Sequence, residues 1–371
     1  MLLRGREIQV IISFRHPNVL ASHYQAFLLS VAVMLVSVAV ALSLGPRMSI
    51  PLYLISALCL GTAVGGTVLI EGIIAPKLAP SQAFSLVSMS APTYMVTNAR
   101  VLEALRGMVG ILGMVHMAEE VNDASVTLPQ AMVAAYILSF FVSLGLMVVQ
   151  LLSLVDVDTA ASSLQGQSGF IYLYLLCATM DSVTTADWMG PAILLANCAS
   201  ATLILTFTSR QVFAFARNGG LPLSRWLATT HRKLAVPVNS VVLTTAFAMA
   251  LASLWCLSPR VIEVIADVQL FVTMATNVVS IGWLLHRRLF GRDVPQHRWS
   301  LGRFGLWINA AALAFCLTIL WLLCMPTSLP VTVRTLSWTP IVGILSLGLP
   351  MAMYLSYSDS RYSSPKVGLC R

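Results

Sequence analysis

The chain is built largely from apolar runs of about 20 residues that carry almost no charged side chains. A helix of this length crosses the hydrocarbon core of a bilayer, where a charged side chain is costly. Eight runs have this character: Ala26–Leu44, Pro51–Ile70, Ala131–Val155, Trp188–Thr208, Val236–Leu257, Val268–Leu285, Phe304–Met325 and Trp338–Tyr357. A ninth, from about Val101 to Ala118, contains glycines. The sequence therefore predicts an all-α integral membrane protein with about nine transmembrane helices.

Composition excludes the usual soluble classes. Hydrophobic residues make up 58% of the 371 residues and charged residues only 10%, whereas soluble domains carry about a quarter charged residues. The cysteines and histidines are scattered, and none of the common hydrolase, nucleotide-binding or zinc motifs occurs, so we expect no enzyme activity, metal or cofactor. We attribute the formal net charge of +8 to basic loops that orient the chain in the membrane, and not to nucleic-acid binding.

Basic residues between the runs predict the orientation of the chain. The loops 209–235 and 286–303 are rich in arginine, and such loops face the cytoplasm. The segment 156–187 contains no Lys or Arg, so we expect it on the opposite side. Within the first basic loop, Ser209–Pro222 is expected to form a short amphipathic helix that ends at its pair of glycines.

The run Val101–Ala118 differs from the others because Gly110 and Gly113 interrupt it. Backbone groups freed by such a break are tolerated at membrane depth only where they line a cavity or are buried in protein. We therefore predict that Gly110, Ile111, Leu112 and Gly113 bind a polar solute. Close helix packing through small residues is the alternative explanation of the glycines.

Charged residues flank this break. Arg106 lies about 6 Å before Gly110 along the helix axis and shares a helix face with Glu103, so it either forms an ion pair or binds a solute carboxylate. Glu119 and Glu120 follow the break at its cytoplasmic end. They are candidates for gating or proton coupling, and solvated loop carboxylates are the alternative.

Further polar residues occur near or within other helices. Asn197 and Ser200, in the run Trp188–Thr208, are candidates for solute contact, with interhelical hydrogen bonding as the alternative role. Asp123 and Ser125 are candidate N-caps for the helix that passes through Pro129.

Two motifs carry a resemblance to a known family. The chain resembles the fungal amino-acid, GABA and choline permeases of the amino-acid/polyamine/organocation superfamily in His116-Met-Ala-Glu-Glu-Val-Asn-Asp-Ala-Ser, continuing through Pro129, and in Ser209-Arg-Gln-Val-Phe-Ala-Phe-Ala-Arg-Asn-Gly-Gly-Leu-Pro222. The resemblance implies an inverted-repeat transporter bundle whose solute lies between the unwound centres of the first and sixth helices. Leu112 departs from it, because an acidic residue is common there in the family.

The resemblance also implies how this single permease domain (1–371) is divided. Residues 7–15 correspond to the end of the third helix, 26–73 to the fourth and fifth helices, 101–285 to the second inverted repeat, and 304–357 to the last two helices. The first three of the usual twelve helices would then be missing.

The activity that the resemblance implies is transport of amino acids or related amines, such as GABA or choline-like solutes, by alternating access with proton coupling. A truncated or degenerate permease remnant without transport activity is the alternative. The expected partners are the small-molecule solute and membrane lipid, with no nucleic acid. The expected location is the plasma membrane, with the vacuolar membrane as the alternative, and no oligomeric state is defined.

Cysteine labelling tests the orientation. In a background without native cysteines, an impermeant maleimide should label a cysteine at Gln165 in intact cells. A cysteine at Arg288 should react only after permeabilisation, because its basic loop faces the cytoplasm. The reverse pattern would contradict the predicted orientation.

Overall fold

The computed structural model describes a defined set of residues. These are 4–15, 22–44, 54, 57–58, 61, 64–68, 72, 113, 115, 118, 121, 123–153, 173, 175, 182–232, 236–256, 258–290, 298–326, 336–358 and 362. The chain forms two compact units, each taken by itself below: residues 1–90, 136–217 and 223–259 make the first, and residues 91–135, 218–222 and 260–371 the second.

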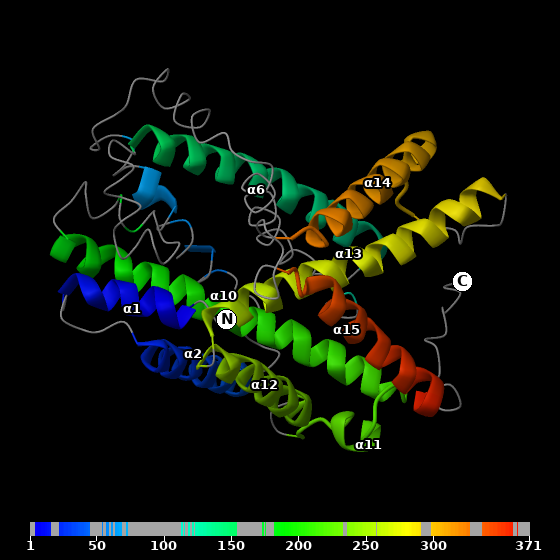
Figure 1. Ribbon diagram of the computed structural model, residues 1–371, viewed down its shortest axis with the longest axis horizontal. Coiled ribbons are helices and arrows are strands. Elements are labelled where there is room, and N and C mark those ends of the chain that lie inside the picture. Colours follow the sequence, from blue (N-terminus) through cyan, green and yellow to red (C-terminus); the bar gives the residue numbers. More distant parts are fainter. Residues whose placement is uncertain are drawn as a thin grey trace. The chain divides into compact units, whose positions relative to one another are not determined.

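Helices dominate, and no strand occurs among the residues just given. In chain order the helices (Figure 1) are α1 (Arg4–Arg15), α2 (His23–Leu44), α6 (Ala124–Ser153), α10 (Ser182–Arg217), α11 (Ser224–Leu227), α12 (Val238–Ser253), the 3-10 helix η4 (Leu254–Cys256), α13 (Pro259–Leu289), the 3-10 helix η5 (Gly302–Phe304), α14 (Gly305–Leu323), α15 (Thr339–Met353) and the π-helix η6 (Tyr354–Ser358).

Six of the described helical segments are long and apolar enough to cross a bilayer. They lie in α2, α6, α10, α13, α14 and α15 with η6, and α12 is a shorter apolar helix. The predicted all-α membrane class is thereby confirmed. The runs Pro51–Ile70 and Val101–Ala118 lie outside the described residues apart from isolated positions, so the number of nine helices stays a prediction.

Helix α10 extends further than the apolar run that predicts it. It continues without interruption to Arg217, so the prediction of a separate helix over Ser209–Pro222 is wrong, and the first part of that segment belongs to α10. The backbone hydrogen bonds of a helix do not depend on side-chain charge. Arg210 therefore ends the apolar run but not the helix. Gly219 then adopts a φ of 78°, a conformation that glycine accepts without steric cost, and the predicted stop at this glycine pair is confirmed.

Helices α1, α2, α10 and α12 pack together in the first unit, with α2 and α10 each contacting the other three. The approach of α1 to α2 is close at Gly5, where a Cβ would overlap the carbonyl oxygen of Ala26 and the hydroxyl of Ser30. Gly190 of α10 faces α1 in the same way, since a Cβ there would lie 2.9 Å from Cγ2 of Ile11. Small residues thus permit the close packing on which helix association in lipid depends.

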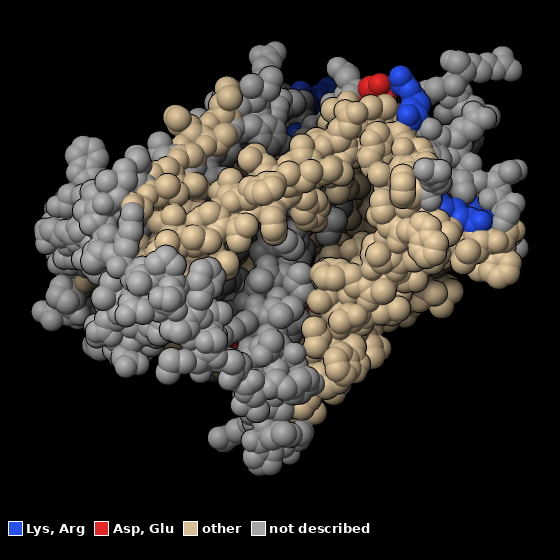
Figure 2. Space-filling model, turned by 90° about the horizontal axis from the view of Figure 1, so that it is seen from above, with Lys and Arg blue, Asp and Glu red and all other residues tan. Residues whose placement is uncertain are grey.

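Helices α13, α14 and α15 share an apolar cluster in the second unit. Leu270, Phe271, Ile319 and Leu323 are buried, and Leu347 of α15 packs against them. The outward surfaces of α14 and α15 remain apolar, with exposed side chains that include Trp321 and Leu345. The described surface visible in Figure 2 is likewise almost free of charge. Such surfaces suit contact with lipid chains.

The contact at Gly5 predicts that a single added methyl group destabilises the protein. Gly5→Ala should lower the free energy of unfolding by about 1–3 kcal/mol, because the new Cβ meets backbone rather than a movable side-chain end. Gly145→Ala on α6 is the matched control, because a Cβ at that position would have no neighbouring atom within 4 Å. Thermal unfolding in detergent measures both, and equal stability of the two variants would contradict the close contact.

Candidate functional site

Most of the predicted solute site lies outside the described residues. Arg106, Gly110, Ile111, Leu112, Glu119 and Glu120 all fall there, so their roles stay predictions. Gly113 is described as an isolated, half-buried position, and Asn197 and Ser200 are half-buried on α10.

A buried carboxylate contacts Asn197 in the first unit. Glu7 of α1 is only 4% exposed, and Nδ2 of Asn197 donates a hydrogen bond to its Oε2 at 2.6 Å. The two residues are 190 positions apart in sequence, so this bond joins α1 to α10. This bond fits the interhelical role that is the alternative for Asn197. Contact between Asn197 and a solute stays a prediction.

Sequence reasoning missed Glu7 as a functional candidate. A signal was nevertheless present, because Glu7 and Gln9 are polar residues beside the apolar residues Ile8, Val10 and Ile11. Gln9 is also buried, and its Nε2 donates to the carbonyl oxygen of Ser22 and to Oε1 of Gln25, each at 3.3 Å. The side chains of Glu7 and Gln9 therefore face the helices that neighbour α1.

Hydroxyl groups continue this polar interior. Ser30 and Ser37 of α2 and Thr202 of α10 are buried. Each hydroxyl donates to the carbonyl oxygen four residues earlier in its own helix, at 2.9, 2.8 and 2.8 Å. A hydrogen bond within the helix can satisfy a buried hydroxyl. Glu7, Asn197 and Gln9 take part in bonds that run between segments of the bundle.

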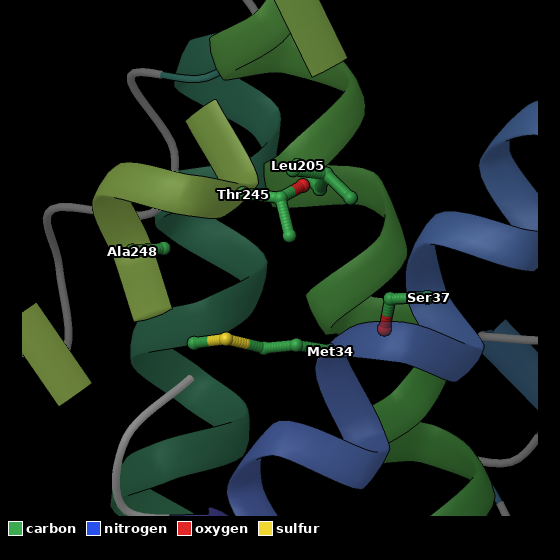
Figure 3. Close-up of a pocket in the computed structure, with 5 residues that line it drawn as sticks. All are labelled: Met34, Ser37, Leu205, Thr245 and Ala248. Carbon is green, nitrogen blue, oxygen red and sulfur yellow. The ribbon is translucent and has the colours of Figure 1, made fainter. Parts of the chain in front are cut away.

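A small cavity lies between α2, α10 and α12. Figure 3 shows its lining residues, which are Met34, Ser37, Leu205, Thr245 and Ala248. Its volume of about 10 Å³ is close to the minimum for one water molecule. An amino acid does not fit there. The cavity is therefore a packing gap and not the solute site in this conformation.

An ion pair in the second unit joins the motif after the predicted break to a basic loop. Nη1 of Arg298 lies 2.7 Å from Oδ1 of Asp123. Asp123 directly precedes α6 with a φ of 52°, and its carbonyl oxygen accepts hydrogen bonds from the amides of Val126 and Thr127. Its Oδ1 accepts from the hydroxyl of Ser125 and from Arg298. Ser125 lies inside α6, so its prediction as an N-cap is wrong. The side chains of Arg298 and Asp123 are 70% and 45% exposed, so the pair contributes only about 0–1 kcal/mol. A contact this weak can open and close readily.

The end of α13 combines aromatic and basic side chains. His286 lies between Trp283 and Phe290, with ring centroids 6.0 and 4.4 Å away, and Arg287 and Arg288 follow it. Trp283 and Phe290 are exposed. This composition is typical of a helix end at the membrane surface.

Comparison with known proteins shows that the chain is similar to permeases. Residues 8–347 match the family model described as Amino acid permease. Similar proteins include an uncharacterized amino-acid permease of Schizosaccharomyces pombe, 23% identical over 68% of this chain and 43% of its own length. Amino-acid permease BAT1 of Arabidopsis thaliana is 25% identical over 67% and 49%, and a choline transporter of Saccharomyces cerevisiae is 23% identical over 61% and 39%. The chain spans about half the length of the curated relatives it matches.

The bond between Asn197 and Glu7 predicts coupled stabilities. Asn197→Leu should lower the free energy of unfolding by about 1–3 kcal/mol, because Glu7 loses a donor while remaining buried. Adding Glu7→Met should recover part of that loss, and Ser200→Ala on the same helix serves as the control. Thermal unfolding of the single and double variants completes the cycle. Strict additivity of the two changes would contradict a direct interaction.

Proposed function

The chain belongs to the amino acid permease family, and from this membership we propose that it moves amino acids or related amines across a membrane. The observation that carries the proposal is the family match over residues 8–347. This is a family of transporters and not of enzymes, in agreement with the lack of catalytic motifs. The six described candidate spans provide the multi-pass membrane body that transport requires.

The names of the relatives support a nitrogen-containing solute. They are named as amino-acid permeases and a choline transporter. Amino acids, GABA and choline all carry a cationic nitrogen, so a carrier for any of them must stabilise a positive charge. Proton coupling, movement by alternating access and residence in the plasma membrane, with the vacuolar membrane as the alternative, are parts of this proposal.

Candidate solute contacts are proposed in each unit by itself. In the second unit, backbone groups at Gly110–Gly113 meet the solute, and Arg106 either binds its carboxylate or pairs with Glu103. In the first unit, Asn197 and Ser200 of α10 are the candidate contacts. Charged ends of an interrupted helix suit a solute that carries charge itself.

An inner gate near Glu119 and Glu120 forms the next part of the proposal. Asp123, three residues after Glu120, pairs with Arg298 in a loop expected on the cytoplasmic side. This pair supports a gate in which the acidic segment holds the basic loops. We also propose that the C-terminal end of α13 contacts lipid headgroups, because it carries aromatic and arginine side chains.

Uptake by cells that express the protein tests the proposal. Labelled amino acid, GABA and choline should be compared in the wild type and in Gly110→Leu and Gly113→Leu. A bulky side chain fills the site and restricts the backbone, so we expect uptake to fall about 5- to 150-fold, equivalent to about 1–3 kcal/mol.

Gly282→Leu on α13 is the matched control, because nothing lies within 4 Å of a Cβ there. All three variants must reach the membrane at wild-type levels. Absence of uptake by the wild type would favour the inactive remnant, and normal uptake by both site variants would refute the interrupted-helix site.

A further inference from the structure

The end of α13 and the beginning of α14 come together in the second unit. The first half of α13 packs on the end of α14 through the apolar cluster that contains Phe271 and Ile319. Arg288, near the end of α13, reaches Gly305, the first residue of α14. The two helices therefore run antiparallel (Figure 1), and the ends of two candidate membrane spans meet at the basic loop between them.

Arg288 lies against the backbone of Gly305. A Cβ at Gly305 would be 2.5 Å from Nη1 of Arg288, and Gly305 is buried. Arg298 in the loop that follows pairs with Asp123, whereas Arg288 has no ion-pair partner among the described residues. A guanidinium is always charged and presents its donors in a fixed plane. Arg288 therefore places a charge between two helices without an acidic partner.

A second donor lies one turn further along α14. Asn309 follows Gly305 by four residues, so the two residues share a face of the helix. Within the described part of the chain, Nδ2 of Asn309 is buried and has no hydrogen-bond partner. Such donors are rare, because losing the hydrogen bond to water is costly. The side chain as a whole is only half-buried, so rotation about its Cβ–Cγ bond can bring the amide to an acceptor at the surface.

The charged residues around this position favour an anion. The other charged or histidine side chains of α13 are Arg260, Glu263, Asp267, His286 and Arg287, and α14 has none. Asp267 lies 21 residues before Arg288, about 30 Å along the helix axis. The segment 289–304 adds three arginines and a histidine against one acid, Asp293. Positive charge therefore predominates where α13 ends, and it attracts an anionic group.

Exposed aromatic side chains flank the position on both helices. Trp283, Phe290 and Trp307 are 60, 69 and 72% exposed. Tryptophan is enriched where headgroups meet acyl chains. The outward surface of α14 continues with exposed apolar side chains such as Phe315 and Trp321. A soluble anion would make no use of this surface, whereas a phospholipid covers it with its acyl chains.

Deepening the headgroup contact of α13 that forms part of the proposed function, and resting on it, we propose that Arg288 and Asn309 bind the phosphate of a phospholipid with net negative charge. Arg288 donates N–H groups to the phosphate oxygens, and Nδ2 of Asn309 donates another. The acyl chains lie along the exposed apolar surface of α14. The lipid joins the ends of α13 and α14 and stabilises the folded protein by binding to it.

Native mass spectrometry of the full chain in detergent tests the site. Phosphatidylserine should bind more tightly than phosphatidylcholine. Arg288→Gln should weaken phosphatidylserine binding about 5-fold, the effect of one arginine near a membrane surface. Asn309→Leu should weaken it about 10-fold, because a hydrogen bond to a charged acceptor is lost. Without lipid, Asn309→Leu should unfold at no lower temperature than the wild type, because it removes a buried donor that has no acceptor.

Two control variants separate a defined site from general attraction. Arg298→Gln removes the same charge from the adjoining loop, and it should change binding by less than about 2-fold because this exposed arginine is already paired. Gly305→Ala keeps every donor but displaces the guanidinium of Arg288, so it should weaken binding as Arg288→Gln does. Gly282→Ala, where nothing lies within 4 Å of the new Cβ, should bind as the wild type does.

Equal binding of the two lipids, or equal losses in Arg288→Gln and Arg298→Gln, would overturn the site. Displacement of phosphatidylserine by an equal concentration of glycerophosphoserine would identify a soluble anion as the ligand and overturn the lipid.

The headgroup contact itself is tested separately. In a background without native cysteines, a nitroxide on Phe290→Cys should collide with nickel chelated to lipid headgroups in vesicles. Absence of collisions refutes the headgroup contact of α13, whereas collisions without a preference for phosphatidylserine refute the defined site alone. Neither measurement uses uptake, so both are independent of the proposed transport.

Discussion

Inside hydrocarbon, every polar group must find its partner within the protein. The described helices meet this requirement mainly through their own backbone, and the buried hydroxyls of Ser30, Ser37 and Thr202 do the same within their own helices. A buried carboxylate cannot bond to the carbonyl oxygens of its own helix as a hydroxyl can. Glu7 accepts a hydrogen bond from Asn197, and this bond joins α1 to α10.

Close approach of the helices makes that bond possible. At Gly5 and Gly190 the backbones come near enough that one added carbon would collide with the neighbouring helix. Lipid provides no hydrophobic drive for helix association, so dispersion at such contacts and bonds between polar side chains have to hold the bundle together. Exposed apolar side chains, such as Trp321 and Leu345, are instead suited to contact with lipid chains.

The sequence predicted the membrane helices well, because the absence of charge over about 20 residues is a local property with one physical cause. It placed helix ends less well. The apolar run that predicts α13 begins at Val268, yet the helix begins at Pro259, where proline suits the first turn. The pairing of Glu7 with Asn197 could not be predicted, since residues 190 positions apart share no local pattern. For the segment 106–120, the glycine break and its flanking charges remain sequence predictions.

The long separation between Glu7 and Asn197 has a consequence for biogenesis. A ribosome adds about 5–20 residues per second, so the 190 residues between the two partners take about 10–40 s to synthesise. During this interval α1 waits in or near the membrane before Asn197 has emerged. The bond between α1 and α10 is therefore expected to form only after Asn197 of α10 has been synthesised and has reached the membrane.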